Sequence, residues 1–583
     1  MRRIILIILV MVGSMWFIYS GHSQSTDNDF GIRVAPLNPA FLKYMEKQRQ
    51  GIRPPTVQDR RVGNWVPPPF DLAHVEGRVD DAVNTTTYPA YYDLRYQPGK
   101  LPPVQDQDGY PACWSFAAYC SLESCLLPDE SRDFSEWHLY NNHGFDRPEG
   151  GNAEITAAYL ARWEGPVDES AAPYGSGSVA NDQLVTSKHV QQVMFLPRRT
   201  GPLDNNTTKW FVMNYGALYA GIRYDGDSFS ETHASHYYRW KDDINHGVAI
   251  VGWDDNYPAS RFLTPPPGNG AFIARNSWGA GWADGGHFYI SYYDTVVTPK
   301  ACFNNAEEVT DYGTIYQYDP YGATSAVGGT GSGPATIYWG ANIFTTVNDQ
   351  PIEAVSFFIT DAHVKCEIYL YKNTSPHSPI DGTLAAHQSA SFIYPGYYTV
   401  RLDAPIFLNR GQRFSVAIRF DNTDFPFPVP IEAPVNGYIT STQANAGESF
   451  VSAGGIQWKD LTLRRPDSNV CIKAQARTIE SQITLTAGRE TVSSWLADID
   501  YGVLTFSVEN LQEVPVSKLL IYRKEGDGTY LLIDEVGEAQ GADFNLVTYT
   551  DRNRLRRDRQ YTYQVAAVNL VDIICGMSNE QTI

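Results

Sequence analysis

Cysteine is scarce in this chain: seven of its 583 residues are cysteine, and they lie far apart. That spacing excludes a disulfide scaffold, because small disulfide-rich folds hold many cysteines close together. Basic residues are also few, with 45 Lys and Arg against 65 Asp and Glu and a formal net charge of −20. Such an acidic chain argues against nucleic acid as a partner. Beyond the N-terminus, no apolar run approaches the ~20 residues of a membrane span.

The first 23 residues have the pattern of a secretory signal peptide. Arg2 and Arg3 precede an apolar stretch from Ile4 to about Tyr19, and a small-x-small sequence ends at Ser23. We therefore expect a secreted or cell-surface protein. The boundary of the apolar stretch is poor, so an uncleaved N-terminal anchor stays open, and it is the one membrane contact that the sequence indicates.

Cys113 stands directly before an apolar helical run, in the stretch Gln-Asp-Gly-Tyr-Pro-Ala-Cys-Trp that begins at Gln107. A thiol at a helix N-terminus lies in a positive field, which lowers the thiol pKa and favours the nucleophilic thiolate. His246 begins a strand-like run, and Asn276 opens the sequence Asn-Ser-Trp-Gly. They follow Cys113 by roughly 130 and 160 residues, near the spacing of a Cys-His-Asn catalytic order.

Each of these residues alone has an ordinary structural explanation. A lone buried cysteine behaves as a small apolar residue, a lone histidine in a strand is usually a hydrogen-bonded core residue, and Asn-Ser-Trp-Gly can be a simple turn. The coincidence of order, spacing and flanking residues over about 200 positions favours catalysis instead.

This order resembles the papain family of cysteine peptidases. The resemblance implies that Cys113 attacks the scissile carbonyl, His246 acts as base and acid, and Asn276 orients the imidazole. Gln107, six positions before the cysteine, would form the oxyanion hole together with the backbone N–H of Cys113. Trp278 would cover the hydrogen bond between Asn276 and His246.

The same resemblance points to substrate-binding positions. Gly150 and Gly151 match the paired glycines that line the papain-type cleft, although two glycines are also a simple turn signal. Ala153, Ile244 and Gly247 fall where the family builds its second specificity pocket. These residues are small or apolar, which predicts an apolar residue before the scissile one.

One departure from the family pattern concerns a disulfide. The usual cysteine before the catalytic one is missing, and Pro148-Glu149 replaces its partner before the paired glycines. Both halves of the bridge are absent together, so we expect packing to hold the cleft wall. The sequence does not pair the remaining cysteines.

The fold class we expect is α+β: a two-lobed papain-like peptidase followed by two β-sandwich units. The expected segments are a signal peptide at 1–23, a propeptide at 24–89, a peptidase domain at 90–308, a lectin-like β-domain at 312–477 and a fibronectin type III-like domain at 483–583. The lectin-like assignment comes from a resemblance to clostridial cell-surface cysteine proteases. We further expect residues from about 312 onward to fold independently of the peptidase.

Ligands of the β-domains are less well indicated. The alternation from Phe414 to Phe420 has the period of a strand. Tyr316, Tyr318 and Trp339 could stack on a cell-surface glycan, but a place in the β-core is an equally good explanation. A structural calcium ion in the lectin-like domain stays open.

Metal and cofactor signals are weak elsewhere. His233 and His236 form an H-x-x-H pair without an adjacent third ligand, and we interpret them as loop residues near the cleft. Catalysis by a cysteine and a histidine requires no cofactor, and the presence of a metal stays unknown.

The leading hypothesis is an exported endopeptidase that is made as a zymogen and acts on protein substrates. A short helical pattern from Phe41 to Gln50 interrupts the Pro-rich segment 24–89, which has too little apolar content to fold alone. We therefore expect the segment to lie over the cleft and to be cut within the stretch Ala82 to Tyr88. Two alternatives stay open: an inactive carbohydrate-binding adhesin, and an acyltransferase that uses the same triad.

Overall fold

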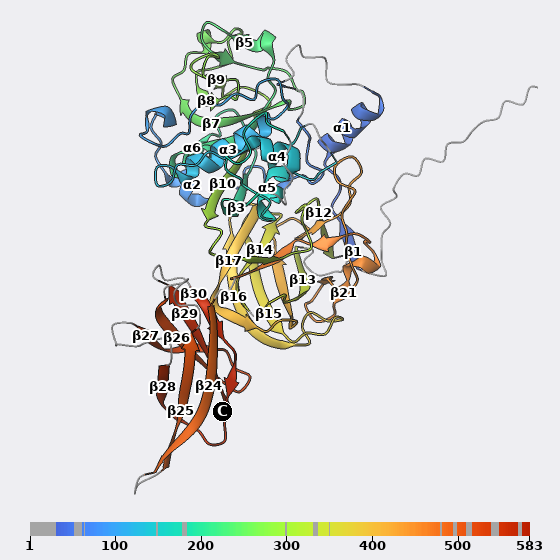
Figure 1. Cartoon of the computed structure of the whole chain (residues 1–583). Coiled ribbons are helices and arrows are strands. Elements are labelled where there is room, and N and C mark those ends of the chain that lie inside the picture. The colour runs from blue at the N-terminus through green and yellow to red at the C-terminus, as the bar shows by residue number, and fades with distance from the viewer. Residues whose placement is uncertain are drawn as a thin grey trace, which may run out of the picture.

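The computed structural model describes most of the chain. The described residues are 31–51, 61–62, 65–146, 150–177, 184–297, 300–329, 336–348, 350–477, 481–493, 498–508, 516–537, 547–569 and 574–583. The expected signal peptide and Pro148-Glu149 lie outside them. Figure 1 shows three successive units, with a helix-containing lobe at one end, a β-rich unit in the middle and a second β-unit at the C-terminus.

The Pro-rich segment before the peptidase contains short elements rather than a core of its own. They are strand β1 (Ile32–Val34), helix α1 (Pro39–Arg49), the 3₁₀ turn Ala73–Val75 and helix α2 (Asp81–Thr85). Helix α1 starts where Asn38 accepts a hydrogen bond from the N–H of Ala40, with Pro39 in the first turn. The expected helix at 41–50 is therefore present. Helix α2 was not expected, and it buries Val83 completely.

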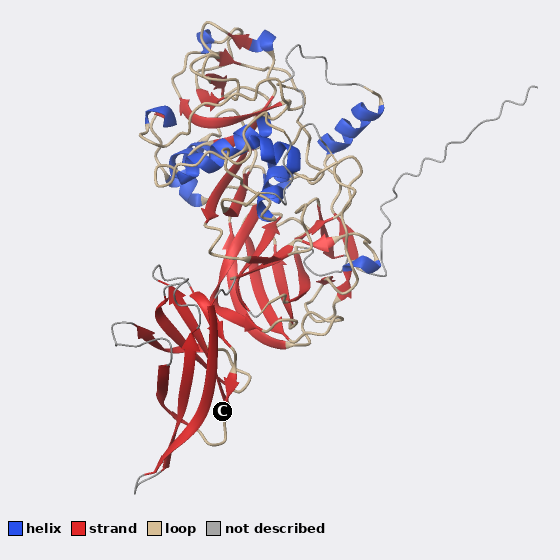
Figure 2. Cartoon of the chain, in the orientation of Figure 1, coloured by secondary structure: helices blue, strands red, loops and turns tan. Residues whose placement is uncertain are grey.

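The peptidase unit places its helices beside its strands (Figure 2). The helices are α3 (Cys113–Leu126), α4 (Glu136–Asn142), α5 (Ala153–Ala161) and α6 (Asn206–Asn214). The strands are β2 (Tyr91–Asp93), β3 (His189–Leu196), β4 (Leu218–Ile222), β5 (Phe229–Ser230), β6 (Ser235–His236), β7 (His246–Asp254), β8 (Ala271–Arg275), β9 (His287–Ser291) and β10 (Lys300–Glu307). Helix α3 is buried from Cys113 to Ser124, as its nearly continuous apolar and small residues predict.

The middle unit is built from antiparallel strands. Its strands are β11 (Thr314–Tyr316), β12 (Ser325–Gly329), β13 (Ile337–Thr345), β14 (Gln350–Ile359), β15 (Val364–Lys372), β16 (Thr383–Phe392), β17 (Gly396–Leu408), β18 (Arg413–Asp421), β19 (Val429–Glu432), β20 (Ser449–Ser452), β21 (Lys459–Asp460), β22 (Asn469–Val470) and β23 (Ile472–Ala476). One sheet has the order β16-β15-β18-β13-β20-β21, and a smaller one has the order β1-β12-β19-β22. The expected strand from Phe414 to Phe420 is present, but both of its faces are buried from Phe414 to Ile418.

One sheet runs without interruption from the peptidase into this middle unit. Its order is β11-β23-β14-β17-β3-β10-β4-β7-β8-β9-β6-β5, and β17 pairs with β3 through Gly396 opposite Met194 and Tyr398 opposite Gln192. Apolar residues of both units share the same clusters. The expectation of an independently folding β-domain therefore finds no support, because a chain ending near residue 310 would leave strand β3 as a bare edge.

The C-terminal unit consists of strands β24 (Ser481–Ser493), β25 (Asp498–Val508), β26 (Val516–Glu525), β27 (Leu531–Gly537), β28 (Val547–Leu555), β29 (Tyr561–Asn569), β30 (Ile574–Ser578) and β31 (Gln581–Thr582). Strands β28-β25-β24 and β27-β26-β29-β30 each run in antiparallel order, and β24 pairs with β30 in parallel. Residues of both groups, such as Leu504 on β25 and Ile521 on β26, share one apolar core.

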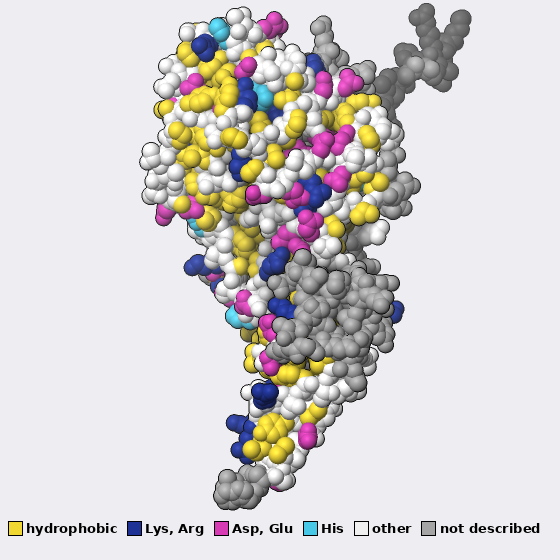
Figure 3. Space-filling model, turned by 60° about the vertical axis from the view of Figure 1, so that its left-hand side comes forward, with side chains coloured by type: hydrophobic (Ala, Val, Ile, Leu, Met, Phe, Trp, Pro, Cys, Tyr) yellow, Lys and Arg dark blue, Asp and Glu magenta, His cyan; other side chains and the backbone are white. Residues whose placement is uncertain are grey.

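The surface carries charges of both signs. On the face shown in Figure 3, acidic and basic side chains are interspersed among apolar ones over the peptidase lobe. Among the described residues, no helix combines the length and the apolar character that crossing a membrane requires. Six cysteines have free thiols: Cys113, Cys120, Cys125, Cys302, Cys366 and Cys471.

Candidate active site

Cys113 is the first residue of helix α3, and its side chain is almost fully buried. Its Sγ accepts a hydrogen bond from the backbone N–H of Gly247, the second residue of β7, at 3.3 Å. Burial raises the pKa of Cys113 to about 11, and the backbone N–H groups of Gly247 and Trp114 offset part of that increase. The expected lowering of the pKa is not met in this state of the protein, since the effect of burial exceeds that of the hydrogen bonds from backbone N–H groups.

His246 and Asn276 meet from neighbouring strands. His246 opens β7, and Asn276 directly follows β8, which pairs with β7. The Nε2 atom of His246 lies 2.8 Å from Oδ1 of Asn276, and both side chains are buried. An amide oxygen can only accept, so Nε2 carries the proton and the lone pair of the neutral imidazole is on Nδ1. This tautomer is the one that can take a proton from a thiol.

Trp278 lies against this pair. Its ring centroid is 5.0 Å from that of His246, and the side chain is 5% exposed. Tyr224 packs edge-on against Trp278 at 4.7 Å, and Asn245 holds the backbone of Tyr224 through two hydrogen bonds of 2.7 and 2.8 Å. Tyr224 was not predicted as a site residue, because nothing in its local sequence pattern sets it apart from other aromatic residues.

Gln107 is completely buried, and its amide is fixed on both ends. Oε1 accepts hydrogen bonds from Oγ of Ser277 at 2.7 Å and from Nε1 of Trp278 at 3.1 Å. Nε2 donates to the backbone carbonyl of Tyr110 at 2.7 Å and to that of Arg61 at 3.2 Å. Ser277 was not predicted as a site residue, and its position between Asn276 and Trp278 was the only feature of the sequence that could have indicated this contact.

Glycines let the elements of the site approach each other. A Cβ atom at Gly247 would lie 3.1 to 3.3 Å from backbone atoms of Cys113 and Trp114, so the close contact of β7 with α3 favours glycine there. A Cβ atom at Gly151 would lie 2.6 Å from the indole ring of Trp114. Gly150 has a φ of 99°, in the region that favours glycine.

The expected pocket residues are Ala153, Ile244 and Gly247, and each packs against buried neighbours. Ala153 starts helix α5 and is buried, and Ile244 packs against the same apolar cluster, which also includes Trp65 and Tyr219. Gly247 lies instead against the N-terminus of α3. Ala153 and Ile244 thus belong to one apolar cluster, and Gly247 contacts the thiol through its backbone N–H.

The N-terminal segment crosses this site. Trp65 forms a parallel bridge with Gly151, and the carbonyl of Val66 accepts a hydrogen bond from Nδ2 of Asn152 at 2.8 Å. The guanidinium of Arg61 lies 4.5 Å from the ring centroid of Trp278, while its carbonyl faces Gln107. The expectation that this segment lies on the cleft surface is met by these residues. In the sequence, the aromatic Trp65 within a Pro-rich stretch was the feature that could have predicted this contact.

The H-x-x-H pair does not form a metal centre. His236 is buried, its Nδ1 lies 3.3 Å from a carboxylate oxygen of Asp294, and its Nε2 accepts the N–H of Asp225 at 3.2 Å. His233 is exposed. Within the part of the chain that the structure describes, no group of three or more His, Cys, Asp or Glu side chains is arranged to hold a metal.

Two family models match the chain. The model described as "Papain family cysteine protease" matches residues 88–308, and the one described as "Lectin like domain" matches residues 315–476. Residues 88–308 are a papain-family cysteine protease domain. The resemblance to peptidases that carry a lectin-like domain is thus confirmed, as is the α+β class of these two domains.

Two curated relatives match just over a third of the chain. The cysteine protease Amb a 11.0101 of Ambrosia artemisiifolia is 26% identical over 36% of this chain and 51% of its own length. Pro-cathepsin H of Mus musculus is 24% identical over 37% of this chain and 65% of its own length. The chain therefore spans about half of the first relative and just under two thirds of the second.

A solved structure extends the likeness to the lectin-like domain. The cysteine protease and lectin-like domains of Cwp84, a surface layer associated protein of Clostridium difficile, align with a TM-score of 0.64 and 24% identity, covering 77% of this chain and 98% of that one. Cwp84 after propeptide cleavage aligns with a TM-score of 0.58 and 25% identity, over 67% of this chain and 99% of that one. The likeness supports the same succession of folds.

Proposed function

We propose that this protein is an exported cysteine endopeptidase that is made as a zymogen and hydrolyses peptide bonds of extracellular or cell-surface proteins. The observation that carries the proposal is the joining of Cys113, His246 and Asn276. The imidazole is held by the 2.8 Å hydrogen bond to Asn276, and the thiol lies against the strand that begins with His246. These contacts support a site in which Cys113 is the nucleophile, His246 the base and Asn276 the orienting group.

The reaction follows from these groups. Nδ1 of His246 takes the proton of Cys113, and the thiolate attacks the scissile carbonyl carbon while the carbonyl oxygen gains negative charge. Nε2 of Gln107 and the backbone N–H of Cys113 donate hydrogen bonds to that oxygen. The imidazolium then protonates the leaving amine, and an acyl thioester stays on the cysteine. Water, deprotonated by the same imidazole, releases the acid and restores the thiol.

The zymogen part of the proposal is supported by the segment in the cleft. The carbonyl of Arg61 accepts the hydrogen bond of the Gln107 amide that the oxyanion would need, and Trp65 covers Gly151. The pKa of about 11 for Cys113 keeps the thiol protonated at neutral pH. Both features are expected to hold the precursor inactive.

The other units are proposed to present the enzyme at the cell surface. We propose a fibronectin type III-like sandwich for the C-terminal unit, supported by its two antiparallel strand groups β28-β25-β24 and β27-β26-β29-β30. In the lectin-like domain, Trp339 lies 5.5 Å from Tyr369, which stacks on His387 at 4.3 Å, and these rings offer a face for a glycan. Tyr316 packs in the core instead. A calcium ion in this domain stays a prediction.

Active-site substitutions test the catalytic proposal. Cys113→Ala should abolish both peptide hydrolysis and labelling by a thiol-reactive inhibitor, while Asn276→Ala should leave partial activity because Asn276 orients and does not react. Hydrolysis that persists in Cys113→Ala would contradict the assignment. Hydrolysis of peptides separates an endopeptidase from an inactive adhesin, and transfer of the acyl group to an amine in preference to water would indicate an acyltransferase.

The maturation cut is the second test. Residues 81–85 are helical with Val83 buried, so the earlier choice of the stretch from Ala82 is corrected to the exposed, non-helical residues that follow it. We expect a new N-terminus between Thr86 and Tyr91 and a rise in hydrolysis as the cut segment is lost from the protein. N-terminal sequencing of wild-type and Cys113→Ala protein over time checks both points. Full activity of the uncut precursor would show that the segment is only a linker.

A further inference from the structure

The prosegment, residues 31–85, touches the lectin-like domain on both sides of the stretch that fills the cleft. On the N-terminal side, β1 extends a lectin-like sheet by pairing with β12, with Ile32 opposite Gly329 and Val34 opposite Val327. The N–H of Ala35 donates to the carbonyl of Ala326 at 2.8 Å. This strand pairing fixes the prosegment through backbone hydrogen bonds before it reaches the peptidase.

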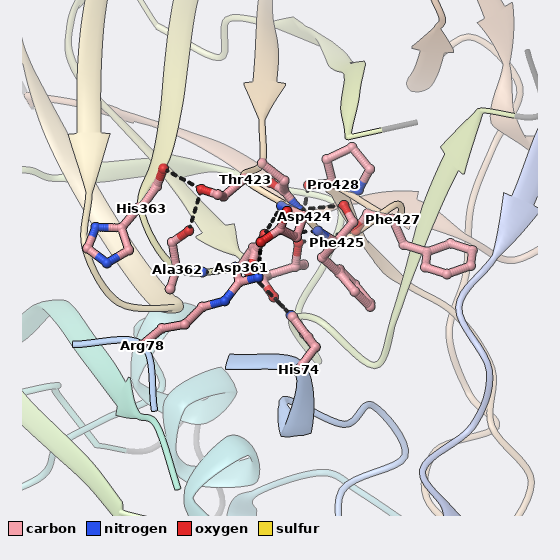
Figure 4. A network of polar contacts seen from close by, with 12 residues as sticks. His74, Arg78, Asp361, Ala362, His363, Thr423, Asp424, Phe425, Phe427 and Pro428 are labelled. Carbon is pink, nitrogen blue, oxygen red and sulfur yellow. Dashed lines mark hydrogen bonds and ion pairs between the residues drawn. The ribbon is translucent and has the colours of Figure 1, made fainter. Parts of the chain in front are cut away.

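On the C-terminal side, two prosegment side chains enter a site on the lectin-like domain (Figure 4). Nη1 of Arg78 lies 3.0 Å from Oδ1 of Asp361, and the same guanidinium pairs with the carboxylate of Asp424. Nε2 of His74 lies 2.8 Å from the carbonyl oxygen of Thr360. The imidazole of His74 stacks on the ring of Phe425, with centroids 3.8 Å apart and an angle of 8° between the planes.

Asp361 is built into the lectin-like domain as a preformed anion. Its side chain is completely buried, and it accepts hydrogen bonds from the backbone N–H groups of Ala362, Asp424 and Phe425 at 2.8 to 3.2 Å. These bonds come from two loops of the lectin-like domain and do not depend on the prosegment. Arg78 supplies the positive charge that the buried carboxylate faces, so the site selects a basic side chain.

The two contacts of the prosegment with the lectin-like domain lie on either side of the cleft residues along the chain. The cleft residues Arg61 and Trp65 lie between β1 and the Arg78 contact, and the exposed stretch 86–90 lies beyond both. A cut in that stretch therefore leaves both lectin-like contacts on one fragment, with the inhibitory residues between them. Two linked contacts hold a fragment far more firmly than either one alone, because the second forms at a high effective concentration.

We propose that the lectin-like domain retains the prosegment after the maturation cut, through the site centred on Asp361 and the pairing of β1 with β12. The cut protein stays inhibited until the prosegment dissociates. This inference rests on the proposed zymogen function for its inhibitory part, whereas retention itself requires no peptidase activity.

Retention is tested in the Cys113→Ala chain, with a recognition sequence for a site-specific protease inserted between Thr87 and Tyr88. After cutting, the prosegment should co-elute with the remainder of the protein in size-exclusion chromatography. Arg78→Ala should raise the dissociation constant of the fragment about 10- to 150-fold, the range for one charge-assisted hydrogen bond. Arg49→Ala is the matched control, because Arg49 is 68% exposed and pairs with Glu46 of its own helix.

Prompt release of the fragment from the unsubstituted cut chain would overturn the proposal, as would equal release from Arg78→Ala and Arg49→Ala. If Arg78→Ala prevents folding, judged by the loss of a cooperative melt, Asp424→Asn tests the same site from the lectin-like side, where its carboxylate is 70% exposed. Faster release from this variant supports the site, and unchanged release overturns it.

The inhibitory part is tested with Cys113 present. The cut chain should hydrolyse peptide slowly while the fragment co-elutes, and Arg78→Ala should raise the rate in step with fragment release. Full hydrolysis with the fragment still bound would overturn inhibition by the retained prosegment. Full hydrolysis by the uncut chain would instead contradict the proposed zymogen, and the co-elution result in the Cys113→Ala chain distinguishes the two failures.

Discussion

Removal of the hydroxyl of Ser277 should slow catalysis through Gln107 rather than directly. The hydroxyl donates to Oε1 of Gln107 at 2.7 Å, and the amide Nε2 on the other end is the proposed oxyanion donor. In Ser277→Ala, the indole N–H of Trp278 still holds Oε1 at 3.1 Å, so the amide is loosened and not freed. Ser277 is thus a positioning residue.

Gln107→Ala should lower kcat more than Ser277→Ala does. Gln107→Ala removes an oxyanion donor, which typically costs about 10²- to 10³-fold in kcat. Ser277→Ala removes one neutral hydrogen bond of roughly 0.5 to 1.5 kcal/mol, which corresponds to about 2- to 13-fold in rate. If Ser277 acts only through the amide, adding Ser277→Ala to Gln107→Ala should cost no further rate.

The assay is kcat/KM for a peptide substrate with the four chains of this double-mutant cycle, after removal of the prosegment. A thermal melt of each chain controls for unfolding, because Gln107→Ala leaves the carbonyl of Tyr110 and the N–H of Trp278 without their buried partner. The reasoning is refuted if Ser277→Ala lowers kcat/KM by the same factor in both backgrounds. It also fails if Gln107→Ala retains nearly the wild-type rate in a folded protein.

Three further outcomes follow from local geometry and burial. Gly151→Ala should lower the free energy of unfolding by roughly 1 to 3 kcal/mol because the new methyl overlaps the indole of Trp114. Gly109→Ala is the control and should leave the stability unchanged, because nothing lies within 4 Å of its added Cβ. Equal melting temperatures of the two variants would contradict this prediction. Burial and then the carboxylate of Glu123 raise the pKa of Glu136 well above 4.5, and burial raises the pKa of Glu123 to about 8. The folded protein then holds protons that the unfolded chain releases, so stability should fall as pH rises from about 4.5 to 8, and Glu136→Gln should flatten that decline in urea unfolding at several pH values. Burial lowers the pKa of His74 below 6.5, although Thr360, Asp361 and Asp71 raise it and Arg78 lowers it further. Protonation of His74 therefore favours the released prosegment, which should bind most firmly above pH 6.5 and dissociate faster as pH falls. A His74→Phe fragment whose release keeps the same pH dependence would disprove this role.

The sequence alone was sufficient to select the residues of the candidate site. Cys113, His246, Asn276, Gln107 and Trp278 could be selected because catalysis restricts the residue type at each position and the order along the chain. The helix after Cys113 and the helix near Phe41 could likewise be predicted, because helix starts and apolar runs are local signals.

Only the tertiary structure decided how these residues behave and what lies over them. Strand β17 pairs with β3 across about 200 residues of sequence, and no local pattern encodes that register. The burial that raises the pKa of Cys113, and the contact of Arg78 with Asp361, likewise depend on surfaces assembled from distant segments. Residue type and spacing follow from the chemistry of each group, whereas dielectric environment, strand partners and the path of the prosegment are properties of the packed chain.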